Sequence, residues 1–437
     1  MFHKQKKKRG VLKLGYLSML RDYRSQKTYF KGIVLGSERP LGKGKVLGKI
    51  PFTGKRLIVM LCAPQRRGKS VLGFRIPEEL LLKFGVPSLI IDPKKEHWMH
   101  KFPLKDKYAR PLLLHPEEVS GRPQGLGDNL VVVTPSVLQD AVNYTDFLVS
   151  PHLSDFLALK DLNLMENLFL EFFEIKGQGL MATRRQLHFT LEEVKKLPKK
   201  EQTFSEWVRI IVNYVEASQN PRTKSGVLLE KIVSLIKAKK VDVPGTQPLR
   251  MVSDLLMENK MVIMQTNLNS SPIAEYDVLM ALSIHLCIEQ RDFFPRGFNV
   301  FVDEIDKPCS SKREGSLLKQ IIVDIPLKYG AYNIGLTGMT QKPNLVQPDL
   351  FEQADAIIVT SITRSYIKWL IENTNISPLL SDYLRALPAA KPPKAKWIIL
   401  LTSEETILEG GMSVTYSEAF YPFATRSQFQ VVGEGHK

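Results

Sequence analysis

Short runs of consecutive apolar residues recur along the chain, separated by polar turns and by stretches with helical spacing. A run that is apolar on both faces is typical of a strand buried inside a parallel sheet, because a strand with one wet face alternates apolar and polar residues. We expect about eight such strands, at residues 57–61, 87–92, 129–134, 261–265, 298–304, 332–339, 356–360 and 397–401. Their alternation with helices predicts an α/β fold in which helices cover both faces of a mostly parallel central sheet.

Between about residue 150 and residue 245 the apolar spacing becomes purely helical. Asn163 followed by Glu166, and Thr203 followed by Glu206, have the spacing of helix capping boxes. After the first box, one helix face is apolar, with Met165, Leu168, Phe169, Phe172 and Ile175. The pattern therefore predicts an all-helical insertion within the α/β fold.

The composition favours a folded protein with an anionic partner. The chain has 437 residues, of which 43% are hydrophobic, so it can bury a sizeable core and is not disordered throughout. The formal net charge of +16 favours nucleic acid as a partner, with an acidic membrane surface as the alternative. The basic N-terminus, MFHKQKKKRG, is a tail that either touches DNA or is simply solvated.

Three cysteines without metal-binding spacing indicate a reducing compartment and no disulfide framework. No apolar stretch reaches the roughly 18 residues that a membrane-spanning helix needs. We therefore expect no integral membrane segment and a cytoplasmic protein.

The stretch RLIVMLCAPQRRGKS, residues 56–70, has the strongest chemical signal. A strand, a tight polar loop and a helix in this order form a phosphate-binding P-loop, although its first position is Ala63 where the pattern has glycine. Lys69 is expected to reach the outer phosphates and the Ser70 hydroxyl to bind Mg²⁺. The residues expected to contact the nucleotide are Ala63, Pro64, Gln65, Arg66, Arg67, Gly68, Lys69, Ser70 and Val71, with the helix starting near Val71.

Asp303 and Glu304 end another apolar run. Two adjacent carboxylates at the end of a buried strand are costly unless they have a function. After a P-loop, Asp303 is expected to hold Mg²⁺ through its water shell, and Glu304 to act as the general base that polarises the attacking water.

Gln341 follows the next predicted strand, which we expect to lie beside the P-loop strand. It either senses the γ-phosphate and orients water, or merely caps a loop.

With these motifs in this order, the chain resembles the HerA/FtsK superfamily of P-loop motor ATPases over roughly residues 45–405. The stretches that carry the resemblance are Gly68-Lys69-Ser70, Asp92-Pro93-Lys94-Lys95-Glu96, Asp303-Glu304 and, most distinctively, Thr340-Gln341-Lys342-Pro343. The resemblance implies a RecA-like ATPase that uses ATP and Mg²⁺, forms a ring that is usually hexameric, and pumps DNA through its centre.

The resemblance also implies a cation supplied by a neighbouring subunit, usually an arginine shortly before the sensor strand. Leu327 occupies that position here, and Lys328 is the nearest basic residue. A cation from the neighbouring subunit raises the rate of hydrolysis by orders of magnitude. Either another basic residue takes the place of the missing arginine, or hydrolysis is slow. The candidates are Lys328, the loop residues Arg66 and Arg67, and Arg364.

We divide the chain accordingly into five segments. These are a basic N-terminal segment with short strands (1–55), the first part of a RecA-like ATPase core (56–149), the helical insertion (150–245), the second part of the core (246–405) and a C-terminal tail (406–437).

The sequence is interpreted as an ATP-hydrolysing DNA translocase, with two alternatives. One is a terminase-like viral packaging ATPase, which also carries arginine in its loop but needs a nuclease domain that the roughly 35 residues after Leu401 do not supply. The other is a nucleotide-binding assembly protein with little hydrolysis. Expected partners are double-stranded DNA bound largely without sequence preference, further copies of the chain, and a nuclease, relaxase or capsid protein, in a virus- or plasmid-encoded setting.

Overall fold

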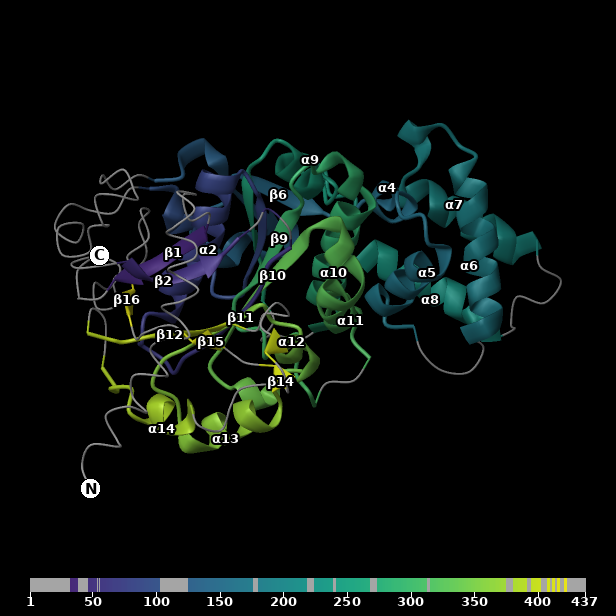
Figure 1. Ribbon diagram of the computed structural model, residues 1–437. Helices are drawn as coiled ribbons and strands as arrows, with labels where there is room; N and C mark the ends of the chain where they lie inside the picture. The colour runs from purple at the N-terminus through teal and green to yellow at the C-terminus, as the bar shows by residue number, and fades with distance from the viewer. Residues whose placement is uncertain are drawn as a thin grey trace, which may run out of the picture.

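The computed structural model is dominated by one large sheet (Figure 1). The structure describes residues 32–37, 46–52, 54, 56–102, 125–175, 180–217, 224–238, 241–267, 273–312, 315–374, 380–390, 394–401, 407–408, 411–412, 415–416 and 420–422. The basic N-terminal tail, which we expect either to touch DNA or to be simply solvated, lies outside these residues. In the described part of the chain no helix is both long and apolar enough to cross a membrane, and Cys62, Cys287 and Cys309 are buried free thiols.

The large sheet has eleven strands in the order β15-β12-β11-β3-β10-β9-β4-β8-β5-β6-β7. All neighbouring pairs from β11 to β7 are parallel, while β12 and β15 join antiparallel at one edge. The strands are β3 (Ile58–Cys62), β4 (Ser88–Asp92), β5 (Leu130–Pro135), β6 (Phe147–Ser150), β7 (Gln247–Pro248), β8 (Met261–Gln265), β9 (Phe298–Val302), β10 (Ile334–Thr340), β11 (Ala356–Val359), β12 (Ile398–Leu401) and β15 (Thr415–Tyr416). The predicted α/β class with a mostly parallel sheet is confirmed.

Both faces of this sheet are covered, as the continuous apolar strands predicted. Along β3, Ile58 and Met60 belong to the hydrophobic core on one face, and Val59 and Leu61 to the core on the other. The second core contains α2 (Lys69–Phe84) and the strands β1 (Gly32–Ser37) and β2 (Val46–Pro51). The first core contains α9 (Met251–Met257), α10 (Ile273–Glu289), α11 (Leu317–Asp324) and α13 (Arg364–Glu372).

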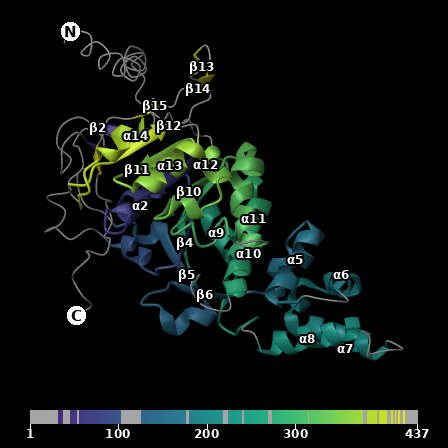
Figure 2. The ribbon, with the colours of Figure 1, turned by 90° about the horizontal axis from the view of Figure 1, so that it is seen from below.

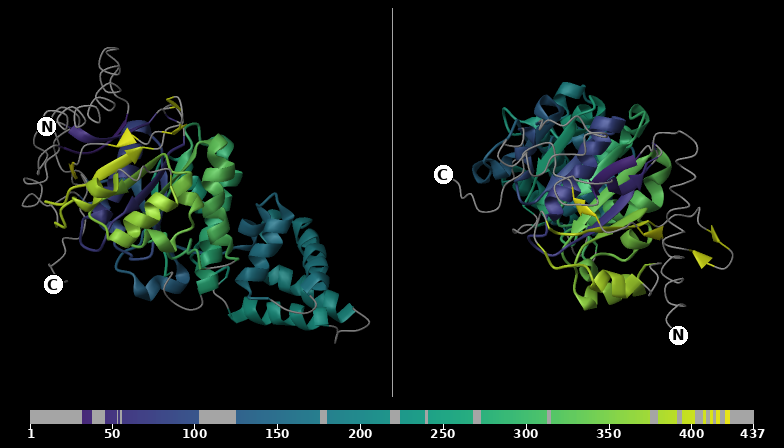
Figure 3. Two further views of the ribbon diagram at one scale, coloured as in Figure 1. Left: turned by 60° about the horizontal axis from the view of Figure 1, so that its bottom comes forward. Right: turned by 60° about the vertical axis from the view of Figure 1, so that its left-hand side comes forward.

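A separate group of helices lies beyond α10 and α11, away from the sheet (Figure 2; Figure 3, left). It consists of α4 (Leu153–Leu157), α5 (Leu162–Phe172), α6 (Leu180–Lys195), α7 (Phe204–Ala217) and α8 (Lys224–Ala238). Their buried aromatic residues, including Phe169 and Trp207, continue the core of the α10 face. The predicted all-helical insertion is therefore present.

Of the two helix caps predicted in this group, the one at Asn163 is wrong and the one at Thr203 is confirmed. Asp161, not Asn163, caps α5, because its carboxylate accepts hydrogen bonds from the backbone N–H groups of Asn163 and Leu164 at 2.9 and 3.2 Å. In the second box the Thr203 hydroxyl accepts from the Glu206 N–H at 3.2 Å, as predicted.

Five strands of the described part of the chain lie outside the large sheet. β16 (Tyr421–Pro422) and β2 flank β1 in a three-stranded sheet, and β13 (Ile407–Leu408) pairs with β14 (Gly411–Met412). Since β15 and β16 fall after residue 405, part of the segment expected as a tail forms strands. The remaining short helices are α12 (Asp349–Glu352) and α14 (Leu380–Arg385).

Candidate functional site

The P-loop lies where β3 ends and α2 begins. Gly68 takes a left-handed conformation (φ 84°) that suits glycine, and the helix starts at Lys69, two residues before the predicted start at Val71. Ala63 N donates to Thr340 O at 3.1 Å, which ties the loop to β10. Gly73 allows α2 to pack directly on β10, because a Cβ there would collide with the Met339 side chain.

Lys69 is buried, and its ammonium has no hydrogen-bond partner. Burial lowers the pKa of Lys69, and the charge of the nearby Asp303 opposes part of that effect. A buried ammonium without an acceptor is unfavourable on its own, and an anion such as a phosphate would satisfy it. Ser70, the second residue of α2, is half-buried beside it, as is Val71.

The other loop residues are arranged around Lys69 with different exposure. Gln65 and Arg66 are exposed, while Pro64, Arg67 and Gly68 are half-buried and Ala63 is buried. Arg66 has a positive φ of 59°, which is strained for a residue with a side chain. Because Arg66 is exposed, it lies at the surface of the loop.

Asp303 and Glu304 follow β9, which β10 separates from β3. Asp303 is fully buried, and its Oδ1 has no hydrogen-bond partner. Burial acts to raise the pKa of Asp303, but the hydrogen bond with His97 and the charges of Lys94 and Lys69 hold that pKa below its usual range. Asp303 therefore has one buried carboxylate oxygen, Oδ1, that a further ligand could use.

Glu304 is more accessible than Asp303, with a side chain 16% exposed and a left-handed backbone (φ 56°). Arg66, Lys95 and Glu304 are three of the seven non-glycine residues with positive φ in the described part of the chain. Such backbone strain tends to gather at functional sites.

The loop after β4 supplies two groups for which the sequence predicted no role. Lys94 Nζ lies 2.8 Å from Asp303 Oδ2 and 3.5 Å from Glu304 Oε1, and His97 Nε2 lies 3.4 Å from the same Asp303 Oδ2. Burial acts to lower the pKa of Lys94, but Asp303 outweighs it and the pKa is raised. The pKa of His97 is likewise raised by Asp92 and Asp303 against the effect of burial.

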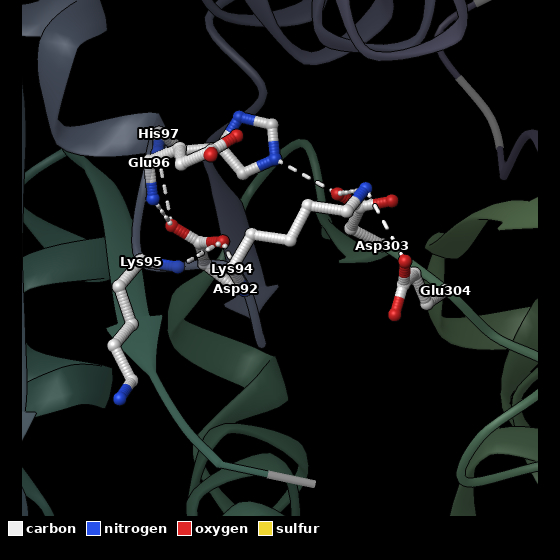
Figure 4. Close-up of polar contacts among 7 residues, drawn as sticks. All are labelled: Asp92, Lys94, Lys95, Glu96, His97, Asp303 and Glu304. Carbon is white, nitrogen blue, oxygen red and sulfur yellow. Dashed lines mark hydrogen bonds and ion pairs between the residues drawn. The ribbon is translucent and has the colours of Figure 1, made fainter. Parts of the chain in front are cut away.

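Asp92 holds this loop in place. Its fully buried carboxylate accepts four backbone N–H groups, from Lys94 and Lys95 at 3.1 and 2.9 Å on Oδ1 and from Glu96 and His97 at 2.9 Å each on Oδ2 (Figure 4). The motif Asp92-Pro93-Lys94-Lys95-Glu96 was visible in the sequence, but only the pairing of β4 with β9 brings Lys94 to Asp303.

Gln341 directly follows β10, at the same edge of the sheet as Lys69 and Asp303, and it is half-buried. The preceding Thr340 donates its hydroxyl to Asp306 Oδ1 at 2.8 Å and accepts from Lys342 N at 2.9 Å. These bonds join the end of β10 to the turn after Glu304. The strand order β3-β10-β9 places the end of β10, and with it the backbone of Gln341, between the ends of β3 and β9.

Lys328 is not brought to this edge. It lies in a π-helical turn, η7 (Ile325–Tyr329), before the amino end of β10, is 60% exposed and pairs with Asp324 at 2.8 Å. Arg364, in contrast, is exposed and follows β11, so it lies at the same edge as the loop. Of the candidate cations, only Lys328 is far from the site of its own subunit.

Known proteins share this fold at low sequence identity. No family model and no curated protein sequence matches the chain. VirB4 of Thermoanaerobacter pseudethanolicus is 13% identical with a TM-score of 0.53, and the match covers 93% of this chain and 98% of that one. The chain has the fold of a RecA-like P-loop ATPase.

Two further structures are similar with TM-scores below 0.5. The bacterial conjugative coupling protein TrwBdeltaN70 has a TM-score of 0.49 at 11% identity, covering 92% of this chain and 95% of that one. The genome packaging NTPase B204 from Sulfolobus turreted icosahedral virus 2, in complex with AMPPCP, has a TM-score of 0.37 at 11% identity, covering 84% and 98%.

Proposed function

We propose that this protein is an ATP-hydrolysing DNA translocase of the HerA/FtsK type. The observation that carries the proposal is the buried ammonium of Lys69, which has no hydrogen-bond partner, at the same sheet edge as the carboxylates of Asp303 and Glu304. A cation and two carboxylates around a P-loop are the parts that nucleoside triphosphate hydrolysis requires.

The residues fit ATP with Mg²⁺. Lys69 would bind the outer phosphates, and the Asp303 oxygen that lacks a hydrogen bond, with the Ser70 hydroxyl, would hold the metal or its water shell. The metal would supply positive charge to the phosphate oxygens. Glu304 would take the proton from the attacking water, and Gln341, at the end of β10, would orient that water or sense the γ-phosphate.

The DNA part of the proposal rests on charge and on the sequence resemblance. A net charge of +16 suits contact with a phosphate backbone, which makes binding salt-dependent and largely independent of sequence. We propose a homo-oligomeric ring, hexameric as the family resemblance implies. Lys328 suits the trans-acting role because it is exposed and remote from its own nucleotide, whereas Arg66 and Arg67 would act within the subunit.

Hydrolysis with and without DNA tests the proposal. We expect ATPase activity that duplex DNA stimulates, a loss of about a hundredfold or more in Glu304→Gln with ATP binding retained, and a loss of ATP binding in Lys69→Ala. Glu258→Gln, at an exposed glutamate after α9, is the matched control. A wild-type protein without ATPase activity in either condition would show that it is not a motor. Tight ATP binding without turnover or ring formation would instead favour the assembly-protein alternative.

A further inference from the structure

Lys94 occupies the space between the two carboxylates of the site. Figure 4 shows its side chain reaching across from the loop after β4 to Asp303 and Glu304. Its ammonium is 2.8 Å from an Asp303 oxygen and 3.5 Å from a Glu304 oxygen. A single positive charge therefore bridges the acid proposed to hold the metal and the acid proposed to activate water.

The position of Lys94 is imposed by its loop. The four backbone bonds to Asp92 fix the course of residues 94–97, and they direct neighbouring side chains to different sides. Lys95 turns away from the carboxylates (Figure 4), and its ammonium donates instead to Ala141 O at 3.4 Å. The contact is thus specific to one of two adjacent lysines.

The metal and the ammonium need the same carboxylates. Lys94 and His97 both contact Asp303 Oδ2, so a divalent cation at the remaining oxygen would lie within a few ångströms of a like charge. We infer that Lys94 is an internal counter-ion that competes with the metal for Asp303 and must leave both carboxylates before the metal–nucleotide complex can bind. This inference rests on the proposed function.

A cleft beside Lys94 leaves room for its side chain to move away from the carboxylates. Its side chain is 28% exposed and borders a cleft that Glu96 and Asn143 also line. Glu96 lies two residues along the same loop (Figure 4), and its charge is one of the smaller causes that raise the pKa of Lys94. Turning from Asp303 toward Glu96 would keep the ammonium near a carboxylate and free Glu304 to approach a water molecule. Lys94 would thereby hold Glu304 inactive until nucleotide and metal arrive together.

Metal binding tests the inference without measuring turnover. We would titrate Mn²⁺ into the full-length protein with a saturating non-hydrolysable ATP analogue and follow free Mn²⁺ by electron paramagnetic resonance. Lys94→Met removes the charge at similar length and should tighten Mn²⁺ binding by about tenfold or more. Lys94→Arg keeps the charge, and Lys95→Met is the matched control on the same loop; both should bind Mn²⁺ as the wild type does.

Thermal unfolding in EDTA and in Mg²⁺ is the second readout, and it also verifies folding. Lys94→Met should be stabilised by Mg²⁺ more than the wild type, because its carboxylates lack their counter-ion. If Lys94→Met does not fold, Lys94→Gln is measured in its place. If Lys94→Met, or Lys94→Gln in its place, binds nucleotide but binds Mn²⁺ no more tightly than the wild type, the inference about Lys94 is wrong. The proposed ATPase function would be unaffected by that result. A wild type that binds no nucleotide would contradict the proposed function instead.

Discussion

Asp92 gives the sharpest structural prediction, because one side chain organises the whole loop that faces Asp303. Its carboxylate is fully buried and is the acceptor for the backbone N–H groups of residues 94–97. We consider Asp92→Asn, which keeps the size of the side chain but replaces one acceptor oxygen with an NH₂ donor. Each oxygen of Asp92 accepts two backbone N–H groups, so the single oxygen of asparagine can keep at most two of the four hydrogen bonds.

The magnitude follows from the two bonds that are lost. A hydrogen bond to a charged group is worth about 1.5–3 kcal/mol, and a buried donor without an acceptor is penalised further. The other two bonds would also weaken, because their acceptor becomes neutral. We therefore expect Asp92→Asn to lower the free energy of unfolding by about 3–5 kcal/mol, a large part of the roughly 5–15 kcal/mol typical of a folded domain.

Two measurements check this expectation. Urea unfolding gives the change in stability, and hydrogen exchange read by mass spectrometry gives the protection of the amides at residues 94–97. Asp140→Asn, at an exposed aspartate, is the control and should change neither. A loss below about 1 kcal/mol, or unchanged protection of those four amides, would refute the assignment of Asp92 as the organiser of the loop.

Three other substitutions test separate features. Lys69→Met should stabilise the nucleotide-free protein by about 1–3 kcal/mol, because it removes a buried ammonium without an acceptor, and should abolish the thermal shift with Mg·ATP; a destabilised variant would contradict this. Arg66→Gly should raise stability by up to about 1 kcal/mol by relieving the left-handed backbone, and an unchanged ATPase rate would exclude Arg66 as the catalytic cation. Burial lowers the pKa of His285 to about 4, whereas the unfolded chain has a histidine pKa of about 6.5. Between these two values the unfolded chain binds a proton that the folded protein does not. The free energy of unfolding therefore falls as the pH is lowered from about 6.5 toward 4. His285→Leu should therefore reduce the loss of stability between pH 7 and pH 4.5 by about 2 kcal/mol, measured by urea unfolding; an unchanged pH dependence would argue against the shifted pKa.

The strands were predictable because a strand that is buried on both faces consists of a run of consecutive apolar residues. Residues 261–265 form β8 as expected, and the run at 57–61 becomes β3 with a shift of one residue. Ends of helices were less predictable, because they depend on local hydrogen bonds. α2 begins at Lys69 since Gly68 supplies the left-handed turn, and the carboxylate of Asp161 caps α5 ahead of Asn163.

The site was predictable wherever its residues belong to a motif that is contiguous in sequence. Lys69, Asp303 and Gln341 all lie at the one edge where parallel strands end. The contact between Lys94 and Asp303 was not predictable, because the two residues are 209 positions apart and meet only through the order of strands in the sheet. The place of Lys328 at the opposite edge likewise required the structure.

The position of β10 limits how this molecule can move. All seven of its residues are buried, and the strand is bonded to β3 on one side and β9 on the other. Sliding it would break two hydrogen-bond ladders at once, so the three strands form a rigid frame about 23 Å long. If the protein is the motor proposed above, the movement that hydrolysis drives must then arise in the loops at the ends of these strands or as a rotation of whole subunits.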